Sequence, residues 1–71
     1  MRTLAEYRRE AGFRTQEALS NATGFKRVNI CKWETGRMYP RIHDIPKLAQ
    51  ALNVTEGEII AAVTASKQDS A

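Results

Sequence analysis

The side chains best suited to recognition chemistry lie in one short stretch, KRVNICKWETG, which begins at position 26. At about 100° per residue of a helix, Ile30 and Trp33 share one face, while Val28 and Lys32 lie opposite and Arg27 lies at the edge. Arginine carries a planar fork of donors that fits O6 and N7 of guanine, and lysine reaches the same acceptors. A valine methyl packs on the C5-methyl of thymine. The outward side of this stretch could therefore contact base edges in a DNA groove.

Other reactive side chains form no recognisable site. Cys31 is the single cysteine, so it cannot form an internal disulfide, and a small exposed residue is the favoured interpretation over a redox switch. His43 has no cysteine or carboxylate nearby at metal-ligand spacing, which favours a surface turn. The sequence has no nucleophile paired with a base, no paired carboxylates and no Gly-rich phosphate loop. It predicts neither an enzyme nor a bound metal or cofactor.

The positive charge is concentrated in the first part of the chain. The net charge is +3, but residues 1–41 carry nine basic and four acidic side chains, or +5, and residues 42–71 carry two basic and four acidic ones, or −2. This asymmetry is typical of a protein with one face toward a polyanion. Solvating charge distributed by chance explains the asymmetry, taken alone, about equally well.

Length and composition limit the architecture. The 71 residues allow one domain, and 42% hydrophobic with 27% charged residues is ordinary for a globular protein. No apolar run approaches the roughly 18 residues of a membrane span, and no signal-peptide pattern is present. We therefore expect one small cytoplasmic domain.

Short helices must position the candidate side chains. Capping boxes of the form T-x-x-E open the first and last expected helices, at Thr3–Glu6 and Thr55–Glu58. Thr15 and Asp44 are the expected N-caps of the second and fourth, and the glycines at positions 12, 24 and 36 end the first three helices. Apolar residues at helical spacing predict the buried faces: Leu4, Tyr7, Ala11, Ala18, Leu19, Ala22, Ile30, Trp33, Ile45, Leu48, Ala49 and Leu52.

No segment alternates as a strand does, and every connection is short. The predicted fold is therefore all-α, a compact bundle of about five short helices in residues 1–64. A polar C-terminal tail follows over residues 65–71.

The second and third helices, with the short turn between them, outline a helix-turn-helix at about residues 15–35. TQEALSNATGFKRVNICKWETGRMYP resembles the signature of the lambda-repressor/Cro-like family, also called the XRE family. The resemblance covers roughly residues 4–63 and includes KLAQALNV from position 47. The matching residues are Thr15, Gln16, Glu17, Leu19, Gly24, Ile30, Trp33, Glu34, Gly36 and Pro40.

The resemblance implies roles for particular residues. The positions that contact bases are Arg27, Val28 and Lys32. The positions for DNA backbone or flanking contacts are Gln16, Lys26, Asn29, Thr35, Arg37 and Tyr39, although Tyr39 fits simple packing in the turn equally well. Arg8 and Glu34 resemble an internal ion pair between the first and third helices, with a structural role.

Three positions depart from the family pattern. Lys26 occupies the cap position where Ser or Thr is usual, so the third helix lacks a side-chain acceptor at its start. Arg14 resembles a one-residue insertion in the turn before Thr15, and Thr23 stands where an apolar residue is usual. These departures leave the pattern recognisable.

The resemblance implies a sequence-specific transcriptional regulator of phage-repressor, Cro or restriction-controller type, bacterial or phage-encoded and nucleoid-associated. Its partner would be the major groove of double-stranded DNA, at an inverted-repeat operator bound by a homodimer. Ile59, Ile60 and Val63 are the expected dimer seam, unless they only close the monomer core. The alternative function is an antitoxin or anti-repressor that uses the same fold to bind protein.

Overall fold

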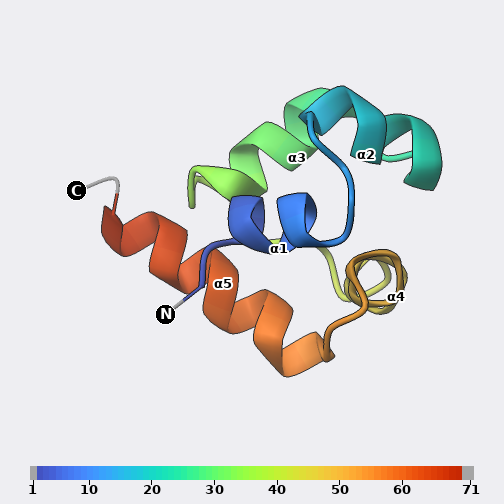
Figure 1. Ribbon diagram of the computed structural model, residues 1–71. Coiled ribbons are helices and arrows are strands. Elements are labelled where there is room, and N and C mark those ends of the chain that lie inside the picture. The colour runs from blue at the N-terminus through green and yellow to red at the C-terminus, as the bar shows by residue number, and fades with distance from the viewer. Residues whose placement is uncertain (1, 70–71) are drawn as a thin grey trace.

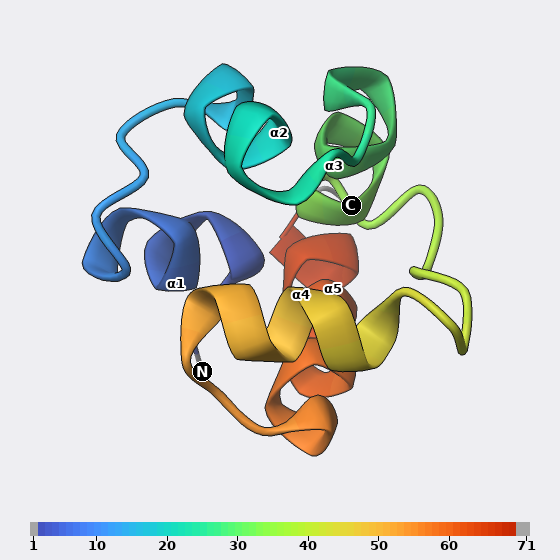
Figure 2. The ribbon, with the colours of Figure 1, turned by 90° about the vertical axis from the view of Figure 1, so that its right-hand side faces the viewer.

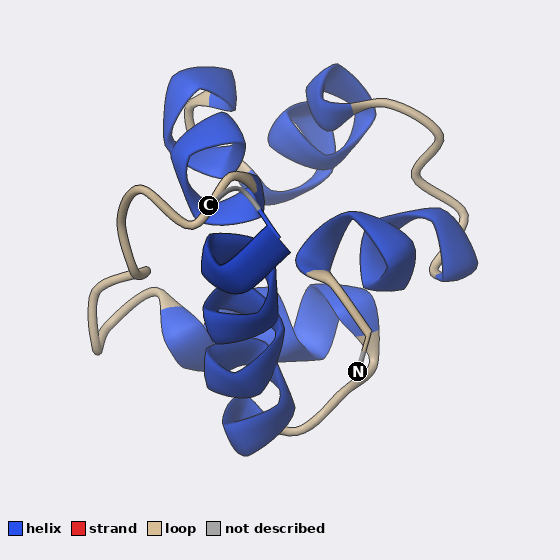
Figure 3. Ribbon diagram, turned by 90° about the vertical axis from the view of Figure 1, so that its left-hand side faces the viewer, coloured by secondary structure: helices blue, strands red, loops and turns tan. Residues whose placement is uncertain are grey.

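Five helices make up the computed structural model, in which residues 2–69 are described (Figure 1). No strand is present within these residues, and the helices are joined by loops and turns (Figure 3). The all-α fold and the expected number of helices are therefore confirmed. The helices are α1 (Leu4–Glu10), α2 (Gln16–Thr23), α3 (Arg27–Glu34), α4 (Ile45–Leu52) and α5 (Glu56–Asp69).

Both predicted capping boxes are present. The backbone N–H of Glu6 donates to Thr3 Oγ1 at 3.3 Å, and the N–H of Thr3 donates back to the Glu6 carboxylate at 3.1 Å. Likewise, the N–H of Glu58 donates to Thr55 Oγ1 at 3.1 Å, and the N–H of Thr55 donates back to the Glu58 carboxylate at 2.9 Å. The donated backbone N–H groups hold the pKa of Glu6 and of Glu58 below the ordinary value for glutamate. Since each box satisfies two free groups of a helix end, the local sequence favours the start of α1 and of α5 at these positions.

The start of α4 differs from the prediction. Asp44 occupies the N-cap position, but its side chain makes no capping hydrogen bond and its backbone is already helical (φ −90°, ψ −24°). Pro46 lies in the first turn, where its missing N–H removes no helical hydrogen bond. Proline geometry therefore favours the helix start here, in place of a side-chain cap.

The core is formed by all five helices. In Figure 2, α2 and α3 lie side by side, and α4 crosses α5 below them. Leu4, Leu19, Leu48 and Ile59 come from four different helices and are each 0% exposed. None of these short helices is long enough to be stable alone, so the shared apolar core holds the domain together.

Burial on α2 differs from the prediction at two neighbouring positions. Ala22 is exposed, and Thr23 is buried in its place. The Thr23 hydroxyl donates to the Leu19 carbonyl at 2.7 Å and accepts the Phe25 N–H at 3.3 Å. A buried threonine is tolerated at this apolar position because both hydrogen-bonding functions of its hydroxyl are satisfied.

The last helix is longer than expected. Helix α5 continues to Asp69, so the polar tail predicted from residue 65 is wrong for residues 65–69, while residues 70 and 71 lie outside the described part. Ala65 and Ser66 are each 4% exposed, and the Ser66 hydroxyl donates to the Ala62 carbonyl at 3.0 Å. Burial against the neighbouring helices maintains these turns.

The expected dimer seam also requires correction. Ile59 and Val63 are 0% exposed within the single chain, whereas Ile60 is 47% exposed. Ile59 and Val63 therefore close the monomer core and are not available to a partner.

Within residues 2–69, no helix has the length and apolar composition needed to cross a membrane.

Candidate nucleic-acid interface

Helix α3 separates an anchoring side from an outward side. Ile30 and Trp33 are 0% and 1% exposed and lie in the core. Val28 is 54% exposed, and the two cationic residues Arg27 and Lys32 are also exposed. An exposed apolar side chain such as Val28 does not form favourable contacts with water. Together with the two cationic residues, it forms a surface that offers both an apolar group and hydrogen-bond donors to a partner.

The turn between α2 and α3 is held by local geometry. Gly24 ends α2 at φ +82°, a conformation that favours glycine. Ser20 Oγ donates to the Phe25 carbonyl at 2.5 Å, and the Phe25 ring meets Trp33 edge to face, with centroids 5.1 Å apart. The ammonium group of Lys47 lies 5.2 Å from the Phe25 ring centroid. The turn is therefore attached to α2, α3 and α4.

The start of α3 lacks a side-chain cap. Lys26 is the N-cap and its side chain makes no capping bond, although its carbonyl accepts the N–H groups of Asn29 and Ile30 at 3.0 and 3.1 Å. A helix start without a side-chain acceptor keeps backbone donors and the positive end of the helix dipole available to an anion. Lys26 adds a full positive charge at the same end.

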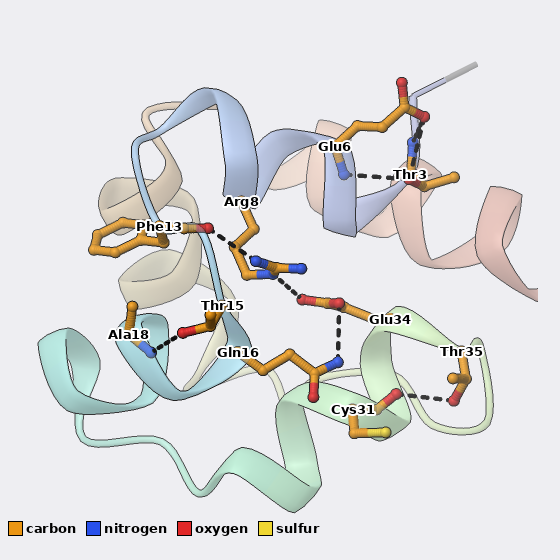
Figure 4. A network of polar contacts seen from close by, with 10 residues as sticks. All are labelled: Thr3, Glu6, Arg8, Phe13, Thr15, Gln16, Ala18, Cys31, Glu34 and Thr35. Carbon is orange, nitrogen blue, oxygen red and sulfur yellow. Dashed lines mark hydrogen bonds and ion pairs between the residues drawn. The ribbon is translucent and has the colours of Figure 1, made fainter.

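The other end of α3 is fixed by a buried polar network (Figure 4). Arg8 Nε donates to Glu34 Oε2 at 2.8 Å, and Arg8 Nη1 donates to the Phe13 carbonyl at 2.9 Å. Gln16 Nε2 donates to the second Glu34 oxygen, Oε1, at 3.0 Å. The side chains of Arg8 and Glu34 are only 8% and 6% exposed. The ion pair expected between them is present, and Gln16, at the start of α2, belongs to the same network.

The turn that follows α3 is folded back onto the helix. The carbonyl of Lys32 accepts the N–H groups of Arg37 and Met38 at 2.9 and 3.3 Å. The hydroxyl of Thr35, the C-cap residue of α3, donates to the carbonyl of Cys31 at 2.9 Å. Tyr39 is 42% exposed, but its hydroxyl lies 2.6 Å from Thr64 Oγ1 on α5. Arg37, a predicted contact in the same turn, is also exposed.

A hollow of about 410 Å³ lies beside the start of α3. Phe25, Trp33 and Met38 provide apolar lining, and Lys26, Asn29, Arg41 and Asp44 provide polar groups. Arg41 is exposed and was not among the residues predicted for this surface. The sequence shows the charge of Arg41 but not its position. Only the path of the α3–α4 loop brings Arg41 to the same hollow as Lys26. No group of three potential metal ligands occurs in the described part of the chain.

The sequence model of the helix-turn-helix domain family matches residues 2–64, which covers most of the chain. Comparisons with curated proteins and with solved structures gave no significant match. The family match includes α2, α3, the turn between them and the residues of the Arg8–Glu34 network. It agrees with the resemblance to the lambda-repressor/Cro-like pattern.

Proposed function

Because this chain belongs to the helix-turn-helix domain family, we propose that it is a sequence-specific transcriptional regulator of phage-repressor, Cro or restriction-controller type. The observation that carries this proposal is the outward side of α3, where Val28 is 54% exposed between the exposed side chains of Arg27 and Lys32. The helix itself is held rigidly from behind by Ile30 and Trp33. Such a helix suits insertion into the major groove of DNA.

The proposed base contacts follow from the chemistry of three side chains. Arg27 and Lys32 donate to guanine O6 and N7, and Val28 packs on a thymine methyl. Each good base contact contributes about 1–3 kcal/mol of discrimination against the wrong base. The target site therefore contains G·C pairs opposite Arg27 and Lys32 and a T near Val28.

Backbone contacts would fix the position of α3 on the duplex without reading the sequence. Lys26 and Arg41 flank the hollow at the start of α3, and Asn29 lines it. Arg37 extends the positive surface beyond the end of the helix. Gln16 Nε2 and the Thr35 hydroxyl already donate within the protein, so we assign these two residues chiefly to holding α3 in place.

Selection from random duplex DNA tests this function. Wild type is expected to enrich a G·C-containing motif, whereas Arg27→Ala and Lys32→Ala each relax one position of that motif. Arg9→Ala is the matched control, because it removes the same charge from an exposed site on α1 and should leave the motif unchanged. Enrichment of no motif, with all binding abolished by salt, would mean general polyanion affinity and would end the proposal.

We further propose that the regulator binds its operator as a homodimer. One small module contacts too few bases to find a site alone in a genome, and a protomer of 29 × 21 × 20 Å is compatible with half-sites roughly 34 Å apart. With Ile59 and Val63 buried, Ile60 is the member of the predicted seam that remains available. Sedimentation of Ile60→Asp is expected to show a folded monomer, and an unchanged dimer would exclude this seam.

A further inference from the structure

The last turns of α5 lie directly against the turn that follows α3, as both Figure 1 and Figure 2 show. A Cβ atom placed on Gly36 would overlap the backbone N and Cα of Lys67 and would lie 2.6 Å from its Cβ. Gly36 also has φ +73°, so two independent constraints favour glycine here. The backbones of the turn and of α5 therefore meet with no Gly36 side chain between them.

A hydrogen bond makes a second link between the same two segments. Thr64 Oγ1 donates its proton to the Ile60 carbonyl at 2.9 Å and lies 2.6 Å from the Tyr39 hydroxyl. Because a threonine hydroxyl has one proton, Tyr39 is the donor and Thr64 the acceptor in the shorter bond. Thr64 thus attaches the turn to α5 at a point about one helical turn before Lys67.

The turn is also attached to α3, at a residue proposed to contact a base. Both Arg37 and Met38 donate their N–H groups to the carbonyl of Lys32. The turn therefore lies between the last turn of α3 and the last turns of α5. A displacement at Lys67 would be transmitted to Arg37 and Lys32 through backbone contacts, and one at Thr64 would reach the turn through its hydrogen bond with Tyr39.

We infer that residues 64–67 of α5 are a positioning element for the DNA-binding surface. They hold the turn from Thr35 to Tyr39 so that Arg37 can contact a phosphate and the end of α3 keeps its angle. This inference rests on the proposed function for its effect on DNA. Most of this element lies beyond residue 64, where the match to the family ends, so its role is additional to the family pattern.

Replacing glycines at two sites tests the backbone contact. Gly36→Ala and Gly12→Ala both place a side chain at positive φ, but a Cβ at Gly12 would have nothing within 4 Å. In the folded chain, Gly36→Ala is expected to speed amide hydrogen exchange at Arg37 and Met38 and to weaken DNA binding at least tenfold. Gly12→Ala should leave both within about twofold. Equal effects of the two substitutions would mean that only the glycine conformation matters and would overturn the inference.

Substitution of Thr64 tests the side-chain link without placing strain on the turn. Thr64→Val removes the acceptor for Tyr39, whereas Thr64→Ser keeps it. We expect Thr64→Val to weaken DNA binding about threefold and to reduce the salt dependence by about one phosphate contact, and Thr64→Ser to restore both. Wild-type affinity and salt dependence in Thr64→Val would refute the link.

The two proposals fail in different ways. If wild type selects no DNA sequence, the proposed function fails, and the effect on DNA inferred for α5 fails with it. Hydrogen exchange needs no DNA, and unchanged exchange at Arg37 and Met38 in Gly36→Ala would refute the positioning element even if wild type binds its operator tightly.

Discussion

Replacing Arg8 by methionine would expose the energetic cost of the buried network behind α3. Methionine keeps an unbranched apolar side chain but removes the guanidinium group that contacts Glu34 and the Phe13 carbonyl. The Glu34 carboxylate, only 6% exposed, would keep its bond from Gln16 and lose its countercharge. Breaking a buried ion pair in this way costs about 3–5 kcal/mol, because an uncompensated charge stays in the interior.

The double substitution should cost much less than the two single ones combined. Combining Arg8→Met with Glu34→Met removes both charges. The remaining cost is the loss of two hydrogen bonds, one to the Phe13 carbonyl and one from Gln16, each worth about 0.5–1.5 kcal/mol. The coupling energy between the two sites is therefore expected to reach about 3 kcal/mol or more. A domain of this size is stabilised by only about 4–11 kcal/mol, so either single variant loses a large share of the total stability.

Urea unfolding followed by circular dichroism in the cold gives the four free energies of unfolding for this cycle. Arg9→Met is the control, since Arg9 is an exposed neighbour on α1 and its replacement should cost about 0.5 kcal/mol or less. A cost below about 1 kcal/mol for Arg8→Met would match an exposed ion pair. That result would refute the argument that burial couples Arg8 and Glu34 energetically. The same conclusion would follow if the costs of the two single substitutions add up to the cost of the double substitution.

Two further predictions concern the helix starts. Lys26→Ser should raise the free energy of unfolding by about 1 kcal/mol, because serine supplies the missing side-chain cap of α3. The same substitution should weaken DNA binding. A loss of stability in thermal unfolding would contradict the first of these expectations. The pKa values of Glu6 and Glu58 are lowered by the backbone N–H groups of Thr3 and Thr55, so the folded chain takes up these protons less readily than the unfolded one. The resulting stabilisation is present above the unfolded pKa of about 4.3 and is lost as pH falls through the lower folded values. NMR titration checks this, and midpoints at the ordinary glutamate pKa would disprove it.

Local chemistry explains why so much of this fold could be predicted. The bonds between Thr3 and Glu6 and between Thr55 and Glu58 span three residues, so their formation depends little on the remainder of the chain. Gly24 and Gly36 have positive φ for an equally local reason. The division of α3 into a buried and an outward side follows from helical periodicity alone. Hence the helices, their order and the candidate base contacts were all accessible from the sequence.

Contacts between residues that are distant along the chain decided the features that the sequence could not predict. Ile59, Ile60 and Val63 are similar apolar residues, and only packing decides that Ile60 stays exposed. Likewise, only the path of the α3–α4 loop brings Arg41 to the hollow that Lys26 also lines.

The sequence by itself determined the local elements: where α1 and α5 start, which glycines end helices, and which side of α3 carries Arg27, Val28 and Lys32. Tertiary structure alone decided how far α5 continues, because burial of Ala65 and Ser66 and the contact with Gly36 maintain its last turns. Capping and periodicity act over three or four residues, whereas burial depends on which surfaces meet in the folded chain.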